Sequence, residues 1–540
     1  MDELPETLDG TYEQTLGGID KQKRDYAYRL FQCLVISRRP LRVKELAELF
    51  AIQHNTEAIP KFDAGLRPDN PEDFVLSACS TLVTLANVDG QQIVQFSHFS
   101  VREYLTSDRI AISEHFSRFR VLPRPAHTLL ARACLSVLLQ LDDRVDRDKI
   151  RNFPLALYAA QYWVDHAQFE SVSLDIQQGM KDLFDKKKPH FATWVRIYNI
   201  DDSSGAFTDT THHAGPYPIP LYYAALCGFS DIAAHLVDAH PQDVNARGGK
   251  LVTPLHAALA KGHLGVAMLL VVRGADTESR DSQSQTPLHI ASYRGYDEVV
   301  SLLINRGACL NAEGFNRRTP LYLASRGRRQ DIARLLLEHS ADANHPDERG
   351  WTPLLVAVQE GHDDIVQLLL HHRADANHPD ERGRTPLLVA VREGRDDIVR
   401  LLLHHRADTS RPDSDCWTPL YHAWRKGRND IVQLLLDHGA DANYPDNRGR
   451  TLLHHTSREG CNDIVQLLLN RGVSPNHPDN RGLTPLHLAS LRNHYDTIQL
   501  LLTHEADPNY PNIRGLTPLH FASLWNYNDI IQLLLDHGAA

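Results

Sequence analysis

The sequence predicts a mainly α-helical protein: a solenoid of 33-residue helix-turn-helix repeats that follows a small winged-helix-like module and a helical bridge. One observation behind this prediction is a Thr-Pro-Leu phrase, or a close variant of it, that returns at a fixed interval. Its threonines are Thr253, Thr286, Thr319, Thr352, Thr385, Thr418, Thr451, Thr484 and Thr517. A looser copy begins at Ile219, and a fixed period outweighs local propensity. The other observation is a pair of apolar runs joined by Asp89-Gly90, a strong β-hairpin signal.

The residues before the repeats divide into four expected parts: an N-terminal tail (1–20), a winged-helix-like module (21–122), a helical bridge (123–200) and a linker (201–218). In the module, apolar spacing predicts helices at 20–37, 43–52, 71–80 and 99–106 and strands at 82–88 and 92–97. In the bridge it predicts helices at 125–141, 153–166, 175–184 and 191–198. Ten repeats are then expected over residues 219–540.

Each repeat has the chemistry of two short helices, as the copy that begins at Thr385 illustrates. The Thr385 hydroxyl suits an N-cap, and Pro386 suits the first helical position, where no N–H is needed. Gly394 ends the first helix, because glycine enters the left-handed conformation without a Cβ clash. A second helix is expected at 396–405, with aspartates at its start and basic residues at its end, as the helix dipole favours.

This pattern resembles the ankyrin repeat over residues 219–540. The resemblance rests on Pro-Leu-His at 254–256, 287–289, 485–487 and 518–520, on the glycine after the first helix, and on Leu-Leu-Leu-x-x-Gly-Ala-Asp at 434–441. Some copies depart from the motif. Leu355 and Leu388 replace its histidine, Leu452 replaces its proline, and the helix-one glycine is replaced at Arg328, Asn493 and Asn526. These departures concern hydrogen bonds between repeats and leave the expected fold unchanged.

Several phrases between residues 21 and 105, among them Phe-Ser-His-Phe-Ser-Val-Arg-Glu-Tyr-Leu at 96–105, resemble the region after the nucleotide-binding domain of fungal NACHT–ankyrin proteins. Those proteins are STAND-type signalling NTPases, whose motor is a P-loop of the form Gly-x4-Gly-Lys-Ser/Thr. This sequence contains no such motif. Gly17-Gly18 is followed by Ile-Asp-Lys-Gln-Lys, which has neither the spacing nor the Ser/Thr. We therefore expect no ATP hydrolysis, no other enzymatic activity and no cofactor.

Composition narrows the function further. The formal net charge is −11, which gives no general attraction to nucleic acid or anionic membranes. The seven cysteines are scattered without a Cys-x-x-Cys pair, no apolar run is long enough to span a membrane, and the N-terminus is acidic. These features favour an intracellular, cytoplasmic protein. The helix expected at 71–80, which would be the recognition helix of a winged-helix DNA reader, contains Glu72 and Asp73 and no Lys or Arg. We expect no nucleic-acid partner.

The 31 histidines do not predict a metal site, although three pairs are adjacent, at 371–372, 404–405 and 454–455. Most histidines stand at ends of second helices or at the motif position, where the repeat explains them. No His-Glu-x-x-His motif or Cys/His cluster with ligand spacing occurs, and no nucleophile signature is present. We expect no metal and no small-molecule substrate.

The resemblance to ankyrin repeats implies a groove lined by the tips between repeats and by the first helices, at three offsets from each threonine. Three residues before it stand Arg349, Arg382, Arg448, Arg481 and Arg514. One residue before it stand Arg318, Trp351, Arg384, Trp417, Arg450, Leu483 and Leu516. Seven residues after it stand Arg326, Gln359, Arg392, Arg425, Arg458, Leu491 and Leu524, with Trp525 beside the last. Arginine and tryptophan are enriched at binding hot spots.

We therefore expect a non-enzymatic interaction scaffold or adaptor whose groove binds protein: an acidic or phosphorylated segment from Arg318 to Arg458, and an apolar one toward the C-terminus. The alternative for the arginines is that they pair with carboxylates in their own tips, such as Asp380 and Glu381. Residues 345–377 and 378–410 are a near-exact tandem duplication whose differences include two groove positions, 351/384 and 359/392. One alternative function is the sensor or regulatory portion of a NACHT-type NTPase; a DNA-binding winged-helix regulator is a weaker one.

Overall fold

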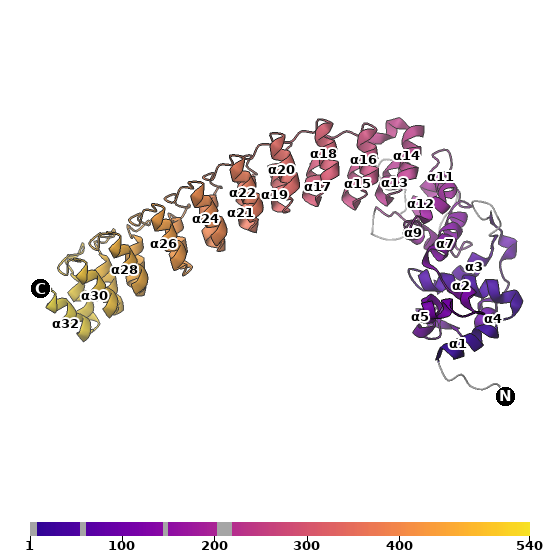
Figure 1. Ribbon diagram of the computed structural model, residues 1–540, viewed down its shortest axis with the longest axis horizontal. Coiled ribbons are helices and arrows are strands. Elements are labelled where there is room, and N and C mark those ends of the chain that lie inside the picture. The colour runs from indigo at the N-terminus through magenta and orange to yellow at the C-terminus, as the bar shows by residue number, and fades with distance from the viewer. Residues whose placement is uncertain (1–7, 54–60, 144–149, 202–218) are drawn as a thin grey trace. The chain divides into compact units, whose positions relative to one another are not determined.

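The computed structural model of this protein describes residues 8–53, 61–143, 150–201 and 219–540 (Figure 1). Helices make up 57% of it and strands 3%, which confirms the predicted mainly α-helical class. The chain divides into two compact units, Met1–Ser282 and Gln283–Ala540. Most of the linker that we expected at 201–218 lies outside the described residues.

In its described residues, the N-terminal module combines six α-helices with a small sheet. The helices are α1 (Leu8–Gly17), α2 (Arg24–Ile36), α3 (Val43–Phe50), α4 (Pro71–Cys79), α5 (Phe99–Thr106) and α6 (Asp108–Ala111). The sheet has the order β1-β5-β4, and its strands are β1 (Leu41–Arg42), β4 (Val83–Val88) and β5 (Gln91–Phe96). Val88 pairs with Gln91 across Asp89-Gly90, which confirms the predicted hairpin. A second antiparallel pair, β2 (Ile52–Gln53) and β3 (Lys61–Phe62), lies between α3 and α4, where the sequence predicted no strand.

Helix α1 corrects the assignment of residues 1–20 to a tail. Its side chains Tyr12 and Leu16 are buried, and the Tyr12 ring lies 5.3 Å from that of Tyr104 in α5. The Tyr12 hydroxyl also shares a hydrogen bond with the hydroxyl of Ser100. Because this helix has a low apolar content and only two buried side chains, its sequence resembles that of an exposed segment.

The bridge is helical, as predicted, and is joined to the first repeat by aromatic packing. Its helices are α7 (Pro123–Leu138), α9 (Ala156–Ala167), α10 (Val172–Asp175), α11 (Gln177–Leu183) and α12 (His190–Ile197). Trp163 of α9 packs against Trp194 of α12 and stacks with Phe229 of the first repeat, at centroid distances of 5.2 and 5.5 Å. The Gln168 side chain donates to the carbonyl of Cys227.

The repeats form pairs of short helices. The first unit contains α13 (Pro220–Cys227), α14 (Ser230–Ala239), α15 (Pro254–Lys261) and α16 (Leu264–Val272). The first helices of the second unit are α17 (Pro287–Arg294), α19 (Pro320–Arg326), α21 (Pro353–Glu360), α23 (Pro386–Glu393), α25 (Pro419–Arg425), α27 (Leu452–Glu459), α29 (Pro485–Arg492) and α31 (Pro518–Leu524). Its second helices are α18 (Asp297–Asn305), α20 (Gln330–Glu338), α22 (Asp363–His371), α24 (Asp396–His404), α26 (Asn429–Asp437), α28 (Asn462–Asn470), α30 (Tyr495–Thr503) and α32 (Asn528–Asp536). Figure 1 shows these pairs as successive layers from α17 to α32.

The local chemistry of each repeat follows the sequence. The Thr385 hydroxyl accepts the N–H of Leu388 at 3.3 Å, and Gly394 caps α23 with φ of 70°. Where the glycine is missing, the left-handed conformation is kept: φ is 54° at Arg328 and 62° at Asn493. Asparagine tolerates this region, whereas arginine at such a position is strained.

Neighbouring repeats are connected by recurring polar bonds. The Asn344 side chain accepts the N–H of Asp375 one repeat later, at 2.7 Å, and Asn377 accepts that of Asp408 in the same way. At the tips, the N–H of Glu381 donates to the carbonyl of Arg349. Together with the buried leucines and alanines of the first helices, these bonds make stability a sum over neighbours.

Candidate functional site

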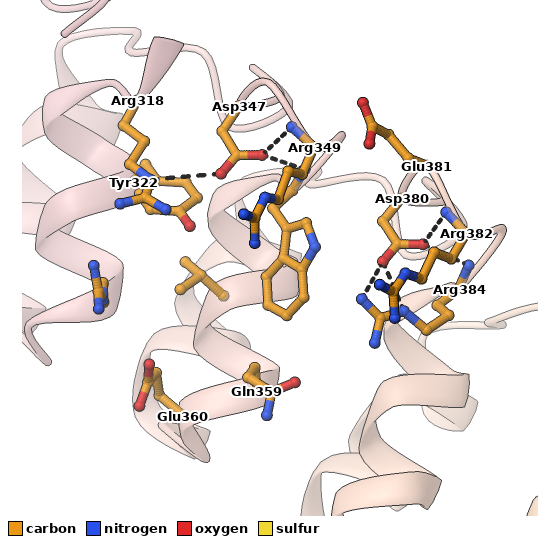
Figure 2. A pocket seen from close by; sticks show the side chains of 13 residues that line it. Arg318, Tyr322, Asp347, Arg349, Gln359, Glu360, Asp380, Glu381, Arg382 and Arg384 are labelled. Atoms are coloured by element: carbon orange, nitrogen blue, oxygen red, sulfur yellow. Dashed lines mark hydrogen bonds and ion pairs between the residues drawn. The ribbon is translucent and has the colours of Figure 1, made fainter. Parts of the chain in front are cut away.

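The candidate site is the face of the second unit formed by the tips and the first helices. Figure 2 shows a hollow on this face, with a volume of about 570 Å³, which we call the arginine pocket. It is lined by Arg318, Tyr322, Arg326, Asp347, Arg349, Trp351, Val356, Gln359, Glu360, Asp380, Glu381, Arg382 and Arg384. The structure thus brings together residues from all three offsets that the sequence analysis selected, and it adds Tyr322, Val356 and four carboxylates.

An aspartate five residues before the threonine shapes each of five consecutive tips. Asp380 is typical, since its Oδ1 accepts the N–H groups of Arg382 and Arg384 at 2.9 and 2.8 Å. Four further aspartates make the same pair of bonds: Asp347, Asp413, Asp446 and Asp479. This use of a carboxylate to bind backbone N–H groups fixes the turn.

The second oxygen of three of these aspartates faces an arginine. Asp380 Oδ2 lies 2.6 Å from Arg384 Nη2 in the same tip. Arg318 reaches Asp347, one repeat away, at 3.5 Å (Figure 2). Arg450 reaches Asp479 in the same way, at 3.2 Å. The side chains of Arg384 and Arg450 are only 16% and 13% exposed. The arginines one residue before the threonine are therefore largely structural.

In the other two tips a histidine takes the place of the arginine. His422 Nε2 lies 3.0 Å from Asp413 Oδ2, and His455 Nε2 lies 3.1 Å from Asp446 Oδ2. The carboxylate can only accept, so each histidine donates through Nε2–H. Burial lowers the pKa of both histidines, and the neighbouring aspartate opposes that shift.

The arginines at the other two offsets are largely unpaired. Within residues 219–540, the guanidinium groups of Arg326, Arg349, Arg382, Arg392, Arg425 and Arg448 make no ion pair or hydrogen bond, and most of these side chains are exposed. Arg458 has only Glu459, at 3.8 Å. In the pocket, Asp347 and Asp380 are paired with Arg318 and Arg384, and Arg326, Arg349 and Arg382 have no carboxylate partner. Pairing with carboxylates of the tips is thus seen one residue before the threonine, and partner binding by the arginines at the other two offsets stays a prediction.

Next to the arginine pocket lies a group of rings that we call the aromatic cluster: Trp417, Tyr421, Trp424 and His455. Trp417 stacks on Tyr421 at 3.7 Å between centroids, and Tyr421 contacts Trp424 and His455 at 5.4 and 5.1 Å. All four side chains are half-buried. Of these four residues, only Trp417 was predicted from the sequence to line the groove. A signal for Trp424 existed, because the equivalent positions 292, 325, 358, 391 and 457 are small serines or valines.

Comparison with known proteins assigns both parts of the chain. The family model for ankyrin repeats (three copies) matches residues 221–314, 255–347, 340–413, 406–479 and 472–540, which together cover more than half of the chain. The chain belongs to the ankyrin-repeat family. Residues 12–118 match the winged helix domain of GPI inositol-deacylase, which is the region that follows NACHT domains. The resemblances stated from the sequence are therefore confirmed.

Two relatives share parts of this chain. The azaphilone pigments biosynthesis cluster protein L of Monascus ruber is 34% identical over 290 residues, which are 51% of this chain and 60% of the relative. Alpha-latrocrustotoxin-Lt1a of Latrodectus tredecimguttatus is 32% identical over 123 residues, which are 23% of this chain and 8% of the toxin. The chain thus spans less than two thirds of the length of each relative.

The motif histidine of the ankyrin repeat is buried at His256, His289, His454 and His487, whereas His520 of the last repeat is exposed. The Nδ1 of His454 accepts the N–H of Thr451 at 3.1 Å, and its Nε2–H donates to the carbonyl of Leu483 at 3.0 Å. Both nitrogens are thus committed in the neutral ring, and burial lowers the pKa of His454 to about 4. His487 makes the same bonds to Thr484 and Leu516.

The leucines predicted to line the C-terminal part of the groove differ in their solvent exposure. Leu483 is 9% exposed and therefore offers almost no surface to a partner. Leu491 is half-buried, whereas Leu516, Leu524 and Trp525 are 36%, 73% and 57% exposed. The apolar surface is therefore concentrated at the last repeat rather than spread over two.

The winged-helix module presents no basic reading surface on α4. Asn70 caps this helix by accepting the N–H groups of Glu72 and Asp73, and the Phe74 ring packs against Tyr26 and Phe50.

In the parts of the chain that the structure describes, no group of three or more His, Cys, Asp or Glu side chains could hold a metal ion. Among the same residues, no helix is long and apolar enough to cross a membrane.

Proposed function

We propose that this protein is an interaction scaffold or adaptor whose ankyrin groove, from Arg318 to Arg458, binds a segment of a partner protein that carries carboxylate or phosphate groups. Ankyrin repeats are typically non-enzymatic interaction modules, and the family assignment supports protein binding in general terms. The nature of the segment is proposed from the groove itself.

The observation that carries the proposal is the set of free guanidinium groups. Arg326, Arg349 and Arg382 line one pocket without an intramolecular partner, although tip carboxylates that pair with arginine are present in the same pocket. An arginine fork binds a carboxylate or phosphate with two parallel hydrogen bonds. Unpaired arginines gathered on a concave face therefore favour an anionic partner.

The proposal is tested by capture of partners with the full chain and two matched variants. R382E/R392E reverses two unpaired charges in the groove. R334E/R400E reverses two exposed charges on the second helices α20 and α24, which contribute nothing to the pocket. We expect proteins that bind the wild type to be lost with the groove variant and kept with the control. Equal capture by both variants would reject the groove as the binding surface.

Site-specific crosslinking locates the contact independently of charge. A photoreactive amino acid replaces Gln359, which lines the pocket, or Gln367, which is exposed on α22 outside it. Crosslinks to the captured partner are expected from position 359 and not from position 367. The reverse pattern would place the partner on the other face of the repeats.

A second candidate is the regulatory portion of a NACHT-type signalling NTPase, which the winged-helix match over residues 12–118 favours. The size of the endogenous protein separates the two, by immunoblot with an antibody to residues 1–200. A band at the mass of this 540-residue chain supports the adaptor. A much larger band supports the second candidate and makes nucleotide binding the next measurement.

A further inference from the structure

We infer that the central groove recognises a two-part segment: an acidic stretch that binds the arginine pocket and an aromatic side chain, a few residues away, that binds the aromatic cluster. This inference rests on the proposed function and specifies its partner. It identifies the partner by chemistry, as an extended acidic peptide with one phenylalanine, tyrosine or tryptophan.

The aromatic cluster breaks the pattern of the array at Trp424, which stands where the other repeats from Thr286 to Thr517 have serine or valine. Tyr421 occupies the motif-histidine position, as Tyr322 does in the repeat of Thr319. At the equivalent positions Ser325, Val358, Val391 and Ser457 are buried, whereas Trp424 is half-exposed because an indole does not fit between neighbouring first helices. A residue that breaks a local rule without a gain in burial indicates a functional site.

The cluster is a ready surface for another ring. Trp417 and Tyr421 are nearly parallel, with an interplanar angle of 17°, and Trp424 lies against Tyr421 at 57°. The His455 ring contacts all three of these rings, and a hydrogen bond to Asp446 fixes its orientation. Such pre-positioned rings bind an incoming aromatic side chain by offset or edge-to-face contact with little loss of side-chain entropy.

Two unpaired arginines, Arg392 and Arg425, stand in the sequence between the arginine pocket and the end of the aromatic cluster. Arg425 follows Trp424 directly, and Arg392 occupies the equivalent position on the preceding repeat, next to the pocket. Burial lowers the pKa of His422, which follows Tyr421 in the chain, and the positive charges of Arg392 and Arg425 act in the same direction. Carboxylates of the partner would therefore find free arginines from the pocket up to the cluster.

The distance between the two parts sets the spacing in the partner. The pocket ends at the tip before Thr385, and the cluster belongs to the repeat of Thr418, so they are separated by one to two helix layers of about 10 Å each. An extended chain advances about 3.3 Å per residue. The aromatic side chain should therefore lie about three to six residues from the acidic stretch.

The test uses the full chain and fluorescent synthetic peptides, with affinity measured by anisotropy. The probe carries an Asp-Asp-Glu stretch and a phenylalanine separated by about four serine or threonine residues. A second probe has the reverse order, because the chain direction in the groove is free. In control probes the phenylalanine is alanine, or the acidic residues are their amides.

One order is expected to bind, and replacing its phenylalanine by alanine should weaken binding by about tenfold on the wild type. On W424L, which keeps apolar volume but removes the ring, the same replacement should change affinity by less than about twofold. W525L removes an exposed tryptophan of the last repeat instead and should behave as the wild type. Thermal melting of W424L and W525L verifies that both variants fold.

Binding that is equal with and without the phenylalanine would overturn this inference and leave an acidic-segment groove in place. Failure of both orders to bind would overturn it as well. Unchanged capture of natural partners by R382E/R392E would instead reject the proposed function, whatever the peptides do. The two results are obtained separately, so the two failures are distinguishable.

Discussion

Two kinds of polar side chain connect the tips and first helices of this array, and they are distributed differently. The buried motif histidine bridges neighbouring repeats at His289, His454 and His487, but its position holds tyrosine or leucine in the four repeats from Thr319 to Thr418. The tip aspartate, in contrast, is present in five consecutive tips, from Asp347 to Asp479.

The two side chains differ in how many polar groups each of them satisfies. Leucine in place of the histidine leaves no buried polar side chain that needs a hydrogen-bond partner. The position then becomes part of the apolar core, and Leu355 and Leu388 are fully buried. In the five tips that carry it, the aspartate accepts from two backbone N–H groups and from a further side chain, whereas Gly248, Gly314 and Asn512 stand at the equivalent position of other tips. Removing a histidine should therefore cost less than removing an aspartate.

The strongest test of this comparison is Asp380→Ala. The change leaves the N–H groups of Arg382 and Arg384 without their acceptor and leaves the half-buried Arg384 guanidinium unpaired. We expect a loss of about 3 kcal/mol of local stability, as when one partner of a buried pair is removed. Hydrogen exchange of the peptide that covers residues 378–395 measures it. A loss as small as that of a surface substitution would show that the tip is held by its backbone alone.

Low pH should destabilise the repeats that have the motif histidine more than those that have leucine in its place. The unfolded chain binds a proton at His454 below pH 6.5, whereas the folded chain does so only near pH 4, because both ring nitrogens are committed in the neutral form. The stability from this histidine is present above pH 6.5 and is lost as the pH falls toward 4. At pH 4.5 the loss is about 2 to 3 kcal/mol for His454.

Hydrogen exchange at several pH values, corrected for the intrinsic rate, measures this loss in α27 and α29. Helices α21 and α23 carry leucine at the motif position and serve as the internal control. Equal acid sensitivity in the four helices would contradict the assigned role of the histidine.

The sequence predicted the fold well because a period of 33 residues leaves little freedom. Helix ends agree with the structure to within a few residues, since threonine, proline and glycine fix them chemically. It missed α1 because that helix buries only Tyr12 and Leu16. No local pattern distinguishes such a segment from a tail.

The candidate site was predicted only in part, for a physical reason. Offsets from the threonine locate a side chain on the groove but do not tell whether a carboxylate already holds it. Arg384 and Arg382 are two residues apart in one tip, yet the first is paired and the second is free. The ion pair of Arg318 with Asp347 also crosses between repeats, and the sequence gives no indication of that direction.

Exchanging the motif residue between the two groups of repeats should have a moderate effect. His454→Leu removes the acceptor of the Thr451 N–H and the donor to the Leu483 carbonyl, which still receives the N–H of Asp479. We expect a cost of about 1 to 2 kcal/mol. In the reciprocal change, Leu388→His, the ring faces the equivalent Trp417 carbonyl, so the effect should stay within about 1 kcal/mol. Urea denaturation of the full chain measures both, and a larger cost for the second variant would break the comparison.

The smallest effects on stability should come from replacing the tip arginines Arg384 and Arg382, and these two variants also test which arginine binds the partner. Arg384→Gln removes an ion pair with a carboxylate that is 2% exposed and a contact with the Trp351 ring, so we expect a loss of about 1 kcal/mol of stability. Arg382→Gln removes an exposed, unpaired charge and should change stability by less than about 0.5 kcal/mol. Partner binding should show the opposite order, with the larger loss at Arg382, because a guanidinium already bound to Asp380 has little left to offer a ligand. The urea midpoint and the amount of captured partner are measured for both variants. If stability and partner binding both fall more in Arg384→Gln than in Arg382→Gln, the paired arginine and not the free one contacts the partner.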